Sequence, residues 1–244
     1  MAAPLAGKVA LVTGGSAGIG RAVALALARA GAETVICARG EAVLQDTVKA
    51  AADSGLKIDA RRTDVGRPDE VNRLFDAIKE KQRRLDILIN AAGILGPLTD
   101  LVNIPPLAWE EVMRINLTGT FLTCCAAARM MKTQHSGCII NISSGVGRRG
   151  RARWGAYATS KFGIEGLTQS LAEELDQEGI SVLAVNPGPT RTRMRALACP
   201  DEDPAVLKTP EAVAGMLVSR VIPTAHTYSG QSLNLHDLMM QNRA

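Results

Sequence analysis

Short apolar runs alternate with longer stretches of helical period from one end of the chain to the other. The first run, "KVALVT" at 8–13, is rich in β-branched residues and is typical of a strand buried on both faces. The stretch after it, "GIGRAVALALARAG" at 18–31, repeats small apolar residues at helical spacing and ends on glycine. Because parallel strands must be joined by crossovers, this alternation predicts a mainly parallel α/β sheet with helices on both faces.

The same pattern predicts seven strands and six helices. The strands are expected near 8–13, 34–39, 57–65, 85–93, 138–144, 181–188 and 232–236. The helices are expected near 18–31, 41–55, 68–82, 109–131, 157–178 and 210–221. Since chains tend to split into domains only beyond roughly 250 residues, a single domain over 1–244 is predicted.

A glycine-rich turn joins the first predicted strand to the first predicted helix. It reads "TGGSAGIG" from Thr13 to Gly20, with further glycines at 14 and 18. Glycine lets the backbone turn sharply and approach a ligand, and the N-terminus of the following helix offers free N–H groups and a partial positive charge. In this context the turn predicts a site for the pyrophosphate of a dinucleotide, and a merely flexible turn is the alternative.

The second predicted strand ends at Ala38-Arg39. In dinucleotide-binding folds a carboxylate at this place binds the ribose hydroxyls of NAD, whereas a nearby arginine accommodates the extra phosphate of NADP. Glu33 precedes the strand and Glu41 opens the next helix, so neither occupies its end. Because a guanidinium suits a phosphate ester, NADP(H) is predicted in preference to NAD(H). The alternative is that Arg39 is a solvated loop residue.

Tyr157 and Lys161 stand four residues apart and share one face of a predicted helix. A tyrosine with its ordinary pKa of about 10 transfers protons poorly at neutral pH, but an adjacent ammonium stabilises the phenolate and lowers that pKa. The pair is therefore a candidate acid-base couple, although the spacing alone is common. It follows a predicted strand that ends in Ser143-Ser144.

Taken together, these motifs resemble the short-chain dehydrogenase/reductase family, over a match from about Gly7 to His236. In chain order they are "TGGSAGIG", Asp64 after the third strand, "NAAG" at 90–93, an asparagine on the long helix, the Ser144, Tyr157 and Lys161 set, and "NPGPTRT" at 186–192. The resemblance implies a single-domain Rossmann fold with a doubly wound sheet of about seven strands. It also implies a cofactor half at about 7–120 and a catalytic half at about 121–244.

The resemblance implies roles for four polar residues. Asn116 resembles the helix asparagine whose local kink holds a water in a proton relay. Ser144, 13 residues before Tyr157, is expected to hydrogen-bond the substrate carbonyl, with Ser143 as its less favoured neighbour. Tyr157 is expected to protonate the developing alkoxide while hydride arrives from the nicotinamide. Lys161 is expected to lower the pKa of Tyr157 and to bind the nicotinamide ribose.

A cofactor site is implied by the same resemblance. Asp64 and Val65 are expected at the adenine, and Asn90 at the adenosine ribose, although Asn90 and Asn116 could each merely stabilise a turn or helix. Ala17 stands where many NADP-dependent members carry Lys or Arg, which leaves Arg39 as the main contact for the extra phosphate. The whole predicted cofactor set is Gly14, Ser16, Gly18, Ile19, Gly20, Arg39, Asp64, Val65, Asn90, Ala91, Gly93, Tyr157, Lys161, Pro187, Gly188, Thr190 and Thr192.

Seven arginines crowd two segments beside the predicted active site. Four lie in "RRGRAR" at 148–153, and three lie in "RTRMR" at 191–195. We hypothesise that Arg149 and Arg151 select an anionic substrate by steering and bidentate contact, with Trp154 packed over it. The alternatives are a solvated rim, partly neutralised by the acidic run at 201–203, and a Trp154 that only closes its loop.

Composition narrows the other possibilities. The net charge of +4 is too small to predict a nucleic-acid partner. Five cysteines without CxxC spacing and three scattered histidines favour reduced thiols in a cytoplasmic protein, with no metal site. No targeting segment or apolar run of about 18 residues predicts a membrane association. The family implies a homo-oligomer, tetramer or dimer, but "SGQSLNLHDLMMQNRA" lacks the usual final glycine pair, which leaves the subunit contact there open.

The sequence thus predicts an NADPH-dependent oxidoreductase that reduces a ketone or aldehyde to an alcohol. One alternative is a 3-oxoacyl thioester reductase, although "AEELDQEG" at 172–179 is acidic where such enzymes often carry basic residues for an acidic carrier protein. An NAD-dependent alcohol dehydrogenase is a second alternative. A non-catalytic regulator that binds nucleotides or nucleic acid is a remote third, which a basic stripe away from the cleft or a broken catalytic set would favour.

Overall fold

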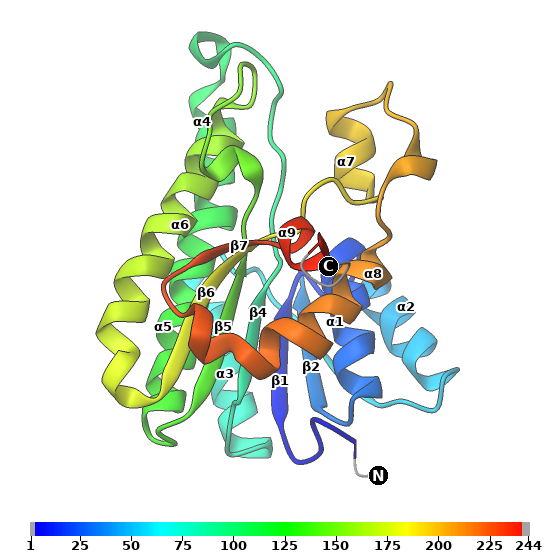
Figure 1. Ribbon diagram of the computed structural model, residues 1–244, viewed down its shortest axis with the longest axis vertical. Coiled ribbons are helices and arrows are strands. Elements are labelled where there is room, and N and C mark those ends of the chain that lie inside the picture. The colour runs from blue at the N-terminus through cyan, green and yellow to red at the C-terminus, as the bar shows by residue number, and fades with distance from the viewer. Residues whose placement is uncertain (1–2, 241–244) are drawn as a thin grey trace.

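A computed structural model describes residues 3–240 and centres on one seven-stranded sheet (Figure 1). Its strands pair in parallel in the order β3-β2-β1-β4-β5-β6-β7. This confirms the predicted α/β class with a doubly wound, parallel sheet. The strands are β1 (Val9–Thr13), β2 (Glu33–Ala38), β3 (Ile58–Arg62), β4 (Ile87–Asn90), β5 (Gly137–Ile142), β6 (Ile180–Asn186) and β7 (Ser232–Asn234).

Helices cover both faces of the sheet (Figure 1). One face carries α1 (Gly18–Arg29), α2 (Glu41–Ala52) and α8 (Pro210–Met216), and the other carries α3 (Pro68–Lys81), α5 (Gly119–Lys132) and α6 (Gly155–Leu175). Each face buries its own apolar cluster, since alternate side chains of the central strands point to opposite sides. The shorter helices are α4 (Pro106–Val112), α7 (Arg193–Ala198) and α9 (Leu235–Met240).

The long helix predicted at 109–131 is in fact two helices joined by a π turn. The turn spans Met113–Thr118, between α4 and α5, and it contains both Arg114 and Asn116. Such turns insert one extra residue into a helix, and helical periodicity does not reveal them. The structure therefore places a backbone irregularity at the position where the family resemblance implied a kink.

Two further boundaries differ from the prediction. α6 starts at Gly155, two residues before Tyr157, and ends at Leu175, where a 3₁₀ turn (Asp176–Glu178) continues it. α7 was not predicted, because six residues are too few to show a helical period, although the Thr192 hydroxyl caps it by accepting from the Arg195 N–H at 3.2 Å. The last four residues of the C-terminal motif lie outside the described part of the chain.

Three of the five cysteines lie in the interior. All five cysteines are free, and Cys37, Cys124 and Cys138 are buried, which raises the pKa of each thiol to about 12. Among the described residues, no group of His, Cys, Asp and Glu is arranged to hold a metal ion. Within the same range, no helix is both long enough and apolar enough to cross a membrane.

The strand order places a crevice at the middle of the sheet. After β3 the chain crosses to the other side of β1 and continues with β4, so the loops that follow β1 and β4 diverge to opposite faces. In open parallel sheets, ligands bind at this point, outside the carboxyl ends of the strands. The glycine-rich turn follows β1, and the segments with Ser144 and Thr190 follow β5 and β6.

Candidate active site

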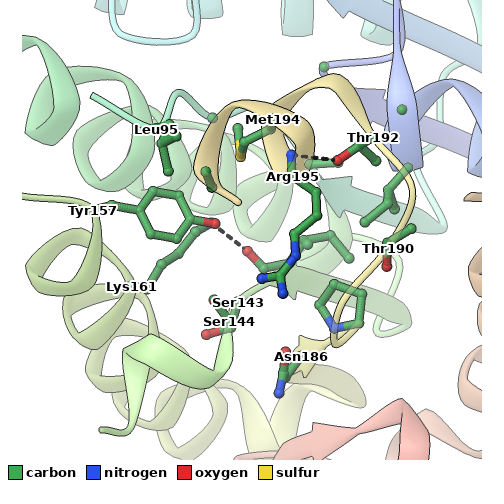
Figure 2. Close-up of a pocket in the computed structure, with 18 of the residues that line it drawn as sticks. Leu95, Ser143, Ser144, Tyr157, Lys161, Asn186, Thr190, Thr192, Met194 and Arg195 are labelled. Carbon is green, nitrogen blue, oxygen red and sulfur yellow. Dashed lines mark hydrogen bonds between the residues drawn. The ribbon is translucent and has the colours of Figure 1, made fainter. Parts of the chain in front are cut away.

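A cavity of about 580 Å³ opens at the carboxyl ends of β1, β4, β5 and β6 (Figure 2). It brings together the glycine-rich turn, the two catalytic candidates on α6 and the segment that leads into α7. Most of the predicted site lines it: Gly14, Ser16, Gly18, Ile19, Gly20, Ala91, Gly93, Ser144, Arg151, Trp154, Tyr157, Lys161, Pro187, Gly188, Thr190 and Thr192.

A second hollow of about 330 Å³ adjoins the glycine-rich turn and extends toward the end of β2. Arg39, Asp64 and Val65 line it, as the prediction of an adenosine site requires. Three predicted residues are absent from the described walls of both cavities: Asn90, Asn116 and Arg149.

The glycine-rich turn is packed too closely for side chains. Gly14 has a φ of 68°, and a Cβ there would lie 2.8 Å from the backbone of Ala92. A Cβ on Gly20 would lie 2.3 Å from the Gly14 carbonyl oxygen. The Thr13 hydroxyl holds the facing loop in place by accepting from the N–H groups of Ala91 and Ala92, both at 3.1 Å. The turn is therefore held close to the β4 loop, with room for a ligand above it.

Tyr157 and Lys161 are both buried on the inner face of α6, with exposed fractions of 9% and 5%. The Lys161 Nζ donates to the Ile142 carbonyl at 2.7 Å and lies 5.5 Å from the centroid of the tyrosine ring. Burial lowers the pKa of Lys161 to about 8, an effect that the charge of Glu165 opposes. Burial also raises the pKa of Tyr157 to about 12, against a hydrogen bond with Ser144 that lowers it.

The protonation of Tyr157 differs from the expectation that a lysine neighbour lowers its pKa. Desolvation of the buried phenolate raises the pKa of Tyr157, and only the hydrogen bond with Ser144 opposes it. A tyrosine in this state stays neutral at pH 7 and retains a proton to donate. Figure 2 shows Tyr157, Lys161 and Ser144 on one side of the cavity.

Ser143 and Ser144 have different partners. Both residues border the cavity, but the Ser143 hydroxyl is buried and donates to the carboxylate of Glu165. Glu165 is only 6% exposed, and the Nε of Arg148 lies 4.0 Å from it. The Ser144 hydroxyl is therefore the freer of the two to meet a ligand, and its contact with the substrate carbonyl stays a prediction.

Asn116 is fully buried at the π turn and fastens three segments together. Its side chain accepts from the Ile94 N–H at 2.8 Å and donates to the Ile94 carbonyl at 2.9 Å. It also donates to the Ser160 hydroxyl at 3.0 Å, one residue before Lys161. The side-chain amide is therefore used to hold the β4 loop against α6.

Asn90 lies in the interior, away from the predicted ribose position. Its amide donates to Asn141 Oδ1 at 3.0 Å, and its carbonyl oxygen accepts from the Thr123 hydroxyl at 2.8 Å. Asn141 in turn donates to Thr168 at 3.0 Å. This buried amide network ties β4 and β5 to α5 and α6, which is the stabilising role that the sequence left as the alternative.

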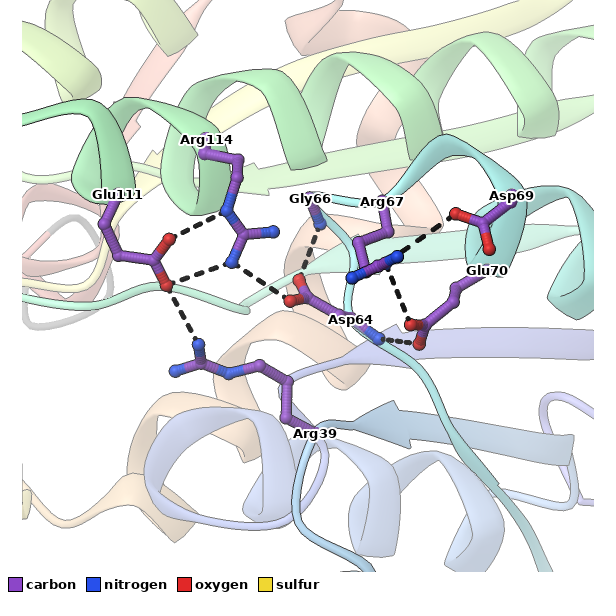
Figure 3. Close-up of polar contacts among 8 residues, drawn as sticks. All are labelled: Arg39, Asp64, Gly66, Arg67, Asp69, Glu70, Glu111 and Arg114. Atoms are coloured by element: carbon purple, nitrogen blue, oxygen red, sulfur yellow. Dashed lines mark hydrogen bonds and ion pairs between the residues drawn. The ribbon is translucent and has the colours of Figure 1, made fainter. Parts of the chain in front are cut away.

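Four residues of alternating charge form a chain beside the second hollow, which Arg39 and Asp64 also line (Figure 3). Arg39 reaches from the end of β2 to Glu111 on α4 at 3.1 Å. Glu111 also accepts from Arg114 at 2.7 and 3.0 Å, and Arg114 donates to Asp64 at 3.0 Å. The hydrogen bond from Arg114 and the N–H of Gly66 keep the pKa of Asp64 below its usual value despite partial burial.

The seven arginines separate into two groups. Three of them, Arg151, Arg193 and Arg195, line the large cavity. Arg148 instead donates to Asn234 at 2.7 Å, and Arg153 donates to the Leu98 carbonyl at 3.2 Å. Arg149 and Arg191 are exposed and outside the cavity walls. Trp154 packs edge-on against the Tyr157 ring, with centroids 5.9 Å apart, and thereby covers the catalytic candidate.

Sequence reasoning missed two groups that the structure brings into the site. Glu165 stands four residues after Lys161, so the helical spacing that paired Tyr157 with Lys161 could have revealed it. Glu111 stands three residues before Arg114, again a helical pair, but its contact with Arg39 joins residues 72 positions apart. That second contact has no signal in local spacing.

The chain is similar to known proteins over most of its length. The family model of the short chain dehydrogenases matches residues 8–203. The chain is 38% identical over 206 residues to "Uncharacterized oxidoreductase YciK" of Escherichia coli K12, which covers 83% of this chain and 81% of the relative. It is 40% identical over 192 residues to a 3-oxoacyl-[acyl-carrier-protein] reductase of Synechocystis, covering 78% of this chain and 77% of that one.

Solved structures agree with the sequence comparisons. A Shigella flexneri protein described as a short chain dehydrogenase, complexed with NADP, superposes with a TM-score of 0.89 at 34% identity, covering 97% of this chain and all of that one. The chain therefore belongs to the short-chain dehydrogenase/reductase family, whose members are oxidoreductases. The predicted family, fold and enzyme class are confirmed.

Proposed function

We propose that the protein is an NADPH-dependent reductase that converts a ketone or aldehyde to an alcohol. The observation that carries the proposal is the burial of Tyr157 beside Lys161 and Ser144, on the wall of a cavity whose other end is the glycine-rich turn. A neutral tyrosine next to an ammonium can give up a proton and stabilise the phenolate that remains.

The residues at the turn suit a dinucleotide. Gly14 and Gly20 lie where a Cβ would collide with backbone, so the chain itself forms a close-fitting cradle. Within the described first turn of α1, no side chain caps the helix and no acidic residue is present, which leaves its N–H groups for an anion. Thr190 and Thr192 face the turn from the segment after β6. We assign the pyrophosphate to this cradle.

In the proposed mechanism NADPH, when bound, supplies a hydride to the carbonyl carbon. The Ser144 hydroxyl donates a hydrogen bond to the carbonyl oxygen and orients it. Tyr157 transfers its phenolic proton to that oxygen as negative charge develops, and the Lys161 ammonium stabilises the phenolate. We assign the π turn at Asn116 to hold the water that returns a proton through Lys161. Residues about 7–120 would bind the cofactor, and about 121–244 would supply the catalytic groups.

NADP(H) is proposed in preference to NAD(H). Arg39 lines the second hollow at the end of β2. Asp64 is the only carboxylate among the described residues of that wall, and it is paired with Arg114. No other carboxylate among those residues is placed to bind the ribose hydroxyls of NAD. The Shigella relative is complexed with NADP, which supports the same assignment. The competing proposal, an NAD-dependent alcohol dehydrogenase, requires Arg39 to contribute nothing to cofactor choice.

A second candidate is reduction of a 3-oxoacyl thioester, which the name of the Synechocystis relative favours. The chemistry at Tyr157 would be the same, and the two proposals differ only in what the cavity mouth recognises. Glu173 and Glu174 are exposed on the last turn of α6 and would repel an acidic carrier protein, so we rank this candidate second. We also propose that the protein is a homo-oligomer, either a tetramer or a dimer, and that it works in the cytoplasm. The free thiols support that compartment, because a cytoplasm keeps cysteines reduced.

The test is NADPH consumption with a panel of ketones and aldehydes, comparing the wild type with Tyr157→Phe. Loss of the proton donor should lower kcat/KM by at least about 10²- to 10⁴-fold, while NADPH binding persists. Tyr228→Phe is the matched control, since Tyr228 is the only other tyrosine and lies away from the cavity walls. A Tyr157→Phe variant as active as the control would contradict the mechanism.

A further inference from the structure

The large cavity is positively charged on its substrate side. Arg151, Arg193 and Arg195 line it together with Lys161, and none of the described residues in its wall is an Asp or Glu. Arg193 directly follows Thr192 beside the glycine-rich turn, where the phosphates of a cofactor would lie. Arg195 lies two residues further along the same segment, and Arg151 lies in the loop after β5 that also carries Ser144. Their charge is not needed for the cradle at the turn.

Arg195 is held with one edge of its guanidinium free. Its Nε and Nη2 donate to the two carboxylate oxygens of Glu202 at 2.5 and 2.6 Å. A guanidinium has five N–H donors, so both hydrogens of Nη1 and one of Nη2 remain for a ligand. Figure 2 shows this side chain reaching from α7 across the cavity toward the side where Ser144 and Asn186 lie. Glu202 thus fixes the direction of the group and leaves its end available.

Arg151 approaches the same space from the loop before α6. Its guanidinium carbon lies 5.6 Å from the centroid of the Trp154 ring, whose other contact is the edge-on packing against Tyr157. Stacking on the indole restricts the side chain at a position close to the proton donor. Arg153, two residues on, has a φ of 67°, a conformation that few residues other than glycine adopt, and this turn orients the loop. Among the described carboxylates, none forms an ion pair with Arg151.

We propose that Arg195 and Arg151 form an oxyanion subsite at the mouth of the catalytic cavity, and that the natural substrate is a carbonyl compound bearing a carboxylate or phosphate group. The inference rests on the proposed reductase function and adds the substrate class to it. Two arginines from different segments of the cavity wall can bind one anion, and a bidentate contact would fix the carbonyl relative to Ser144 and Tyr157. The four arginines outside the cavity walls take no part.

The test uses two aldehydes of the same shape, 4-carboxybenzaldehyde and methyl 4-formylbenzoate, with NADPH. For Arg195→Gln and Arg151→Gln, kcat/KM should fall by about 10- to 100-fold with the carboxylate and by less than about twofold with the ester. Arg149→Gln is the matched control, since it removes the same charge two residues from Arg151 but outside the cavity wall. The Kd of NADPH, followed by its fluorescence, should stay constant in all three variants.

Each other outcome would overturn the subsite. Equal losses with both aldehydes would mean that the arginines are structural, and an equal loss in Arg149→Gln would mean that only the general field attracts the anion. A rise in the Kd of NADPH that matches the loss would assign the arginines to the cofactor phosphates.

A binding measurement separates this inference from the proposed reaction. Calorimetric titration of 4-(hydroxymethyl)benzoate into the protein with NADP⁺ should show saturable binding that Arg195→Gln weakens by the same factor. If no compound of the ketone and aldehyde panel is reduced but this binding persists, the proposed function fails and the subsite stands. If no saturable binding is seen in the wild type, the subsite fails whatever the enzyme reduces.

Discussion

The two ends of the cleft use charge in opposite ways. At the catalytic end, Lys161, Tyr157 and Glu165 are each less than 10% exposed and share few partners. At the adenosine end, Arg39, Glu111, Arg114 and Asp64 form a chain of alternating signs whose side chains are 51%, 40%, 33% and 17% exposed. Burial without a full partner changes the protonation of a group, whereas exposed pairs keep their charges and mainly orient one another.

This contrast separates chemistry from recognition. Desolvation raises the pKa of Tyr157 to about 12 and lowers that of Lys161 to about 8, and the buried ammonium is a cost in stability that the proposed proton transfer would use. The charged chain at the other end is accessible to solvent. A cofactor phosphate could therefore replace the Glu111 carboxylate as the partner of Arg39 at a small cost in free energy. Substitutions at the two ends should therefore differ in the sign of their effect on stability as well as in their effect on activity.

The largest effect is expected from Lys161→Met. Reduction should slow by about 10²- to 10⁴-fold at pH 7 because the phenolate loses its ammonium. The cofactor-free protein should nevertheless become more stable. Removal of the buried ammonium should raise the free energy of unfolding by up to about 3 kcal/mol. Loss of its hydrogen bond to Ile142 should subtract about 1 kcal/mol from that gain. Folding lowers the pKa of Lys161 from 10.5 to about 8, so the unfolded chain binds the proton more tightly. The gain should be complete below pH 8 and vanish as the pH approaches 10.5.

Denaturant unfolding of the wild type and the variant at pH 7 and pH 10 would measure this difference. An unchanged or lower free energy of unfolding in Lys161→Met at pH 7 would show that burial of the ammonium is not a strain on the fold.

Removal of the Arg39 guanidinium should alter the preference between NADPH and NADH. In Arg39→Ala the Kd of NADPH should rise by about 10- to 100-fold, since a charge-assisted contact with the phosphate is lost, while the Kd of NADH changes by less than about twofold. Fluorescence titration with both cofactors measures the ratio. Arg67→Ala is the control, because Arg67 pairs with Asp69 and Glu70 at the outer end of the same region (Figure 3). Equal losses for NADPH and NADH would remove Arg39 from phosphate recognition.

The pH dependence should report the catalytic end alone. Reduction needs a charged Lys161, so kcat/KM should be level below about pH 8 and fall as the pH rises through the pKa of the ammonium. The charge of Glu165 raises the pKa of Lys161. The groups that face the Glu165 carboxylate are Lys161, Ser143 and Arg148. Glu165→Gln should therefore move the falling limb to lower pH, whereas Glu173→Gln, exposed on the same helix, should not. A limb that stays in place in Glu165→Gln would exclude an electrostatic role for the carboxylate.

The smallest effect is expected from Arg114→Met in the charged chain. Because its ion pairs are partly exposed, the free energy of unfolding should fall by only about 0.2–1 kcal/mol, opposite in sign to the change in Lys161→Met. The KM for NADPH should rise a few-fold, since Asp64 and Glu111 lose the group that positions them, and kcat should be retained. Thermal unfolding and steady-state kinetics test both statements; a loss of kcat as large as that of Lys161→Met would erase the distinction between the two ends.

Features that depend on short-range spacing in the sequence were predicted correctly. The strand-helix alternation, the glycine-rich turn and the pair Tyr157 and Lys161 follow from short-range periodicity and from the conformational freedom of glycine, and the structure places them as expected. Glu165 was within reach of the same reasoning, one helical turn beyond Lys161, and was overlooked.

Other features depend on contacts that no window of sequence contains. Asn90 matched a motif but its amide is consumed by Asn141 and Thr123, far away in the chain. The loop at 148–153 offered four equivalent arginines, and only its folded path brings Arg151 to the cavity wall and leaves Arg149 outside it. The contact between Arg39 and Glu111 likewise exists only once β2 and α4 are brought together.

The π turn between α4 and α5 sets the phase of a helix that serves both ends of the cleft. One additional residue rotates everything downstream by about 100° around the helix axis. Within this turn Arg114 points to Asp64, and Asn116, two positions later, points to Ile94 and Ser160. Through this irregular turn, a single stretch of chain contacts both ends of the cleft and couples the position of Asp64 to that of α6.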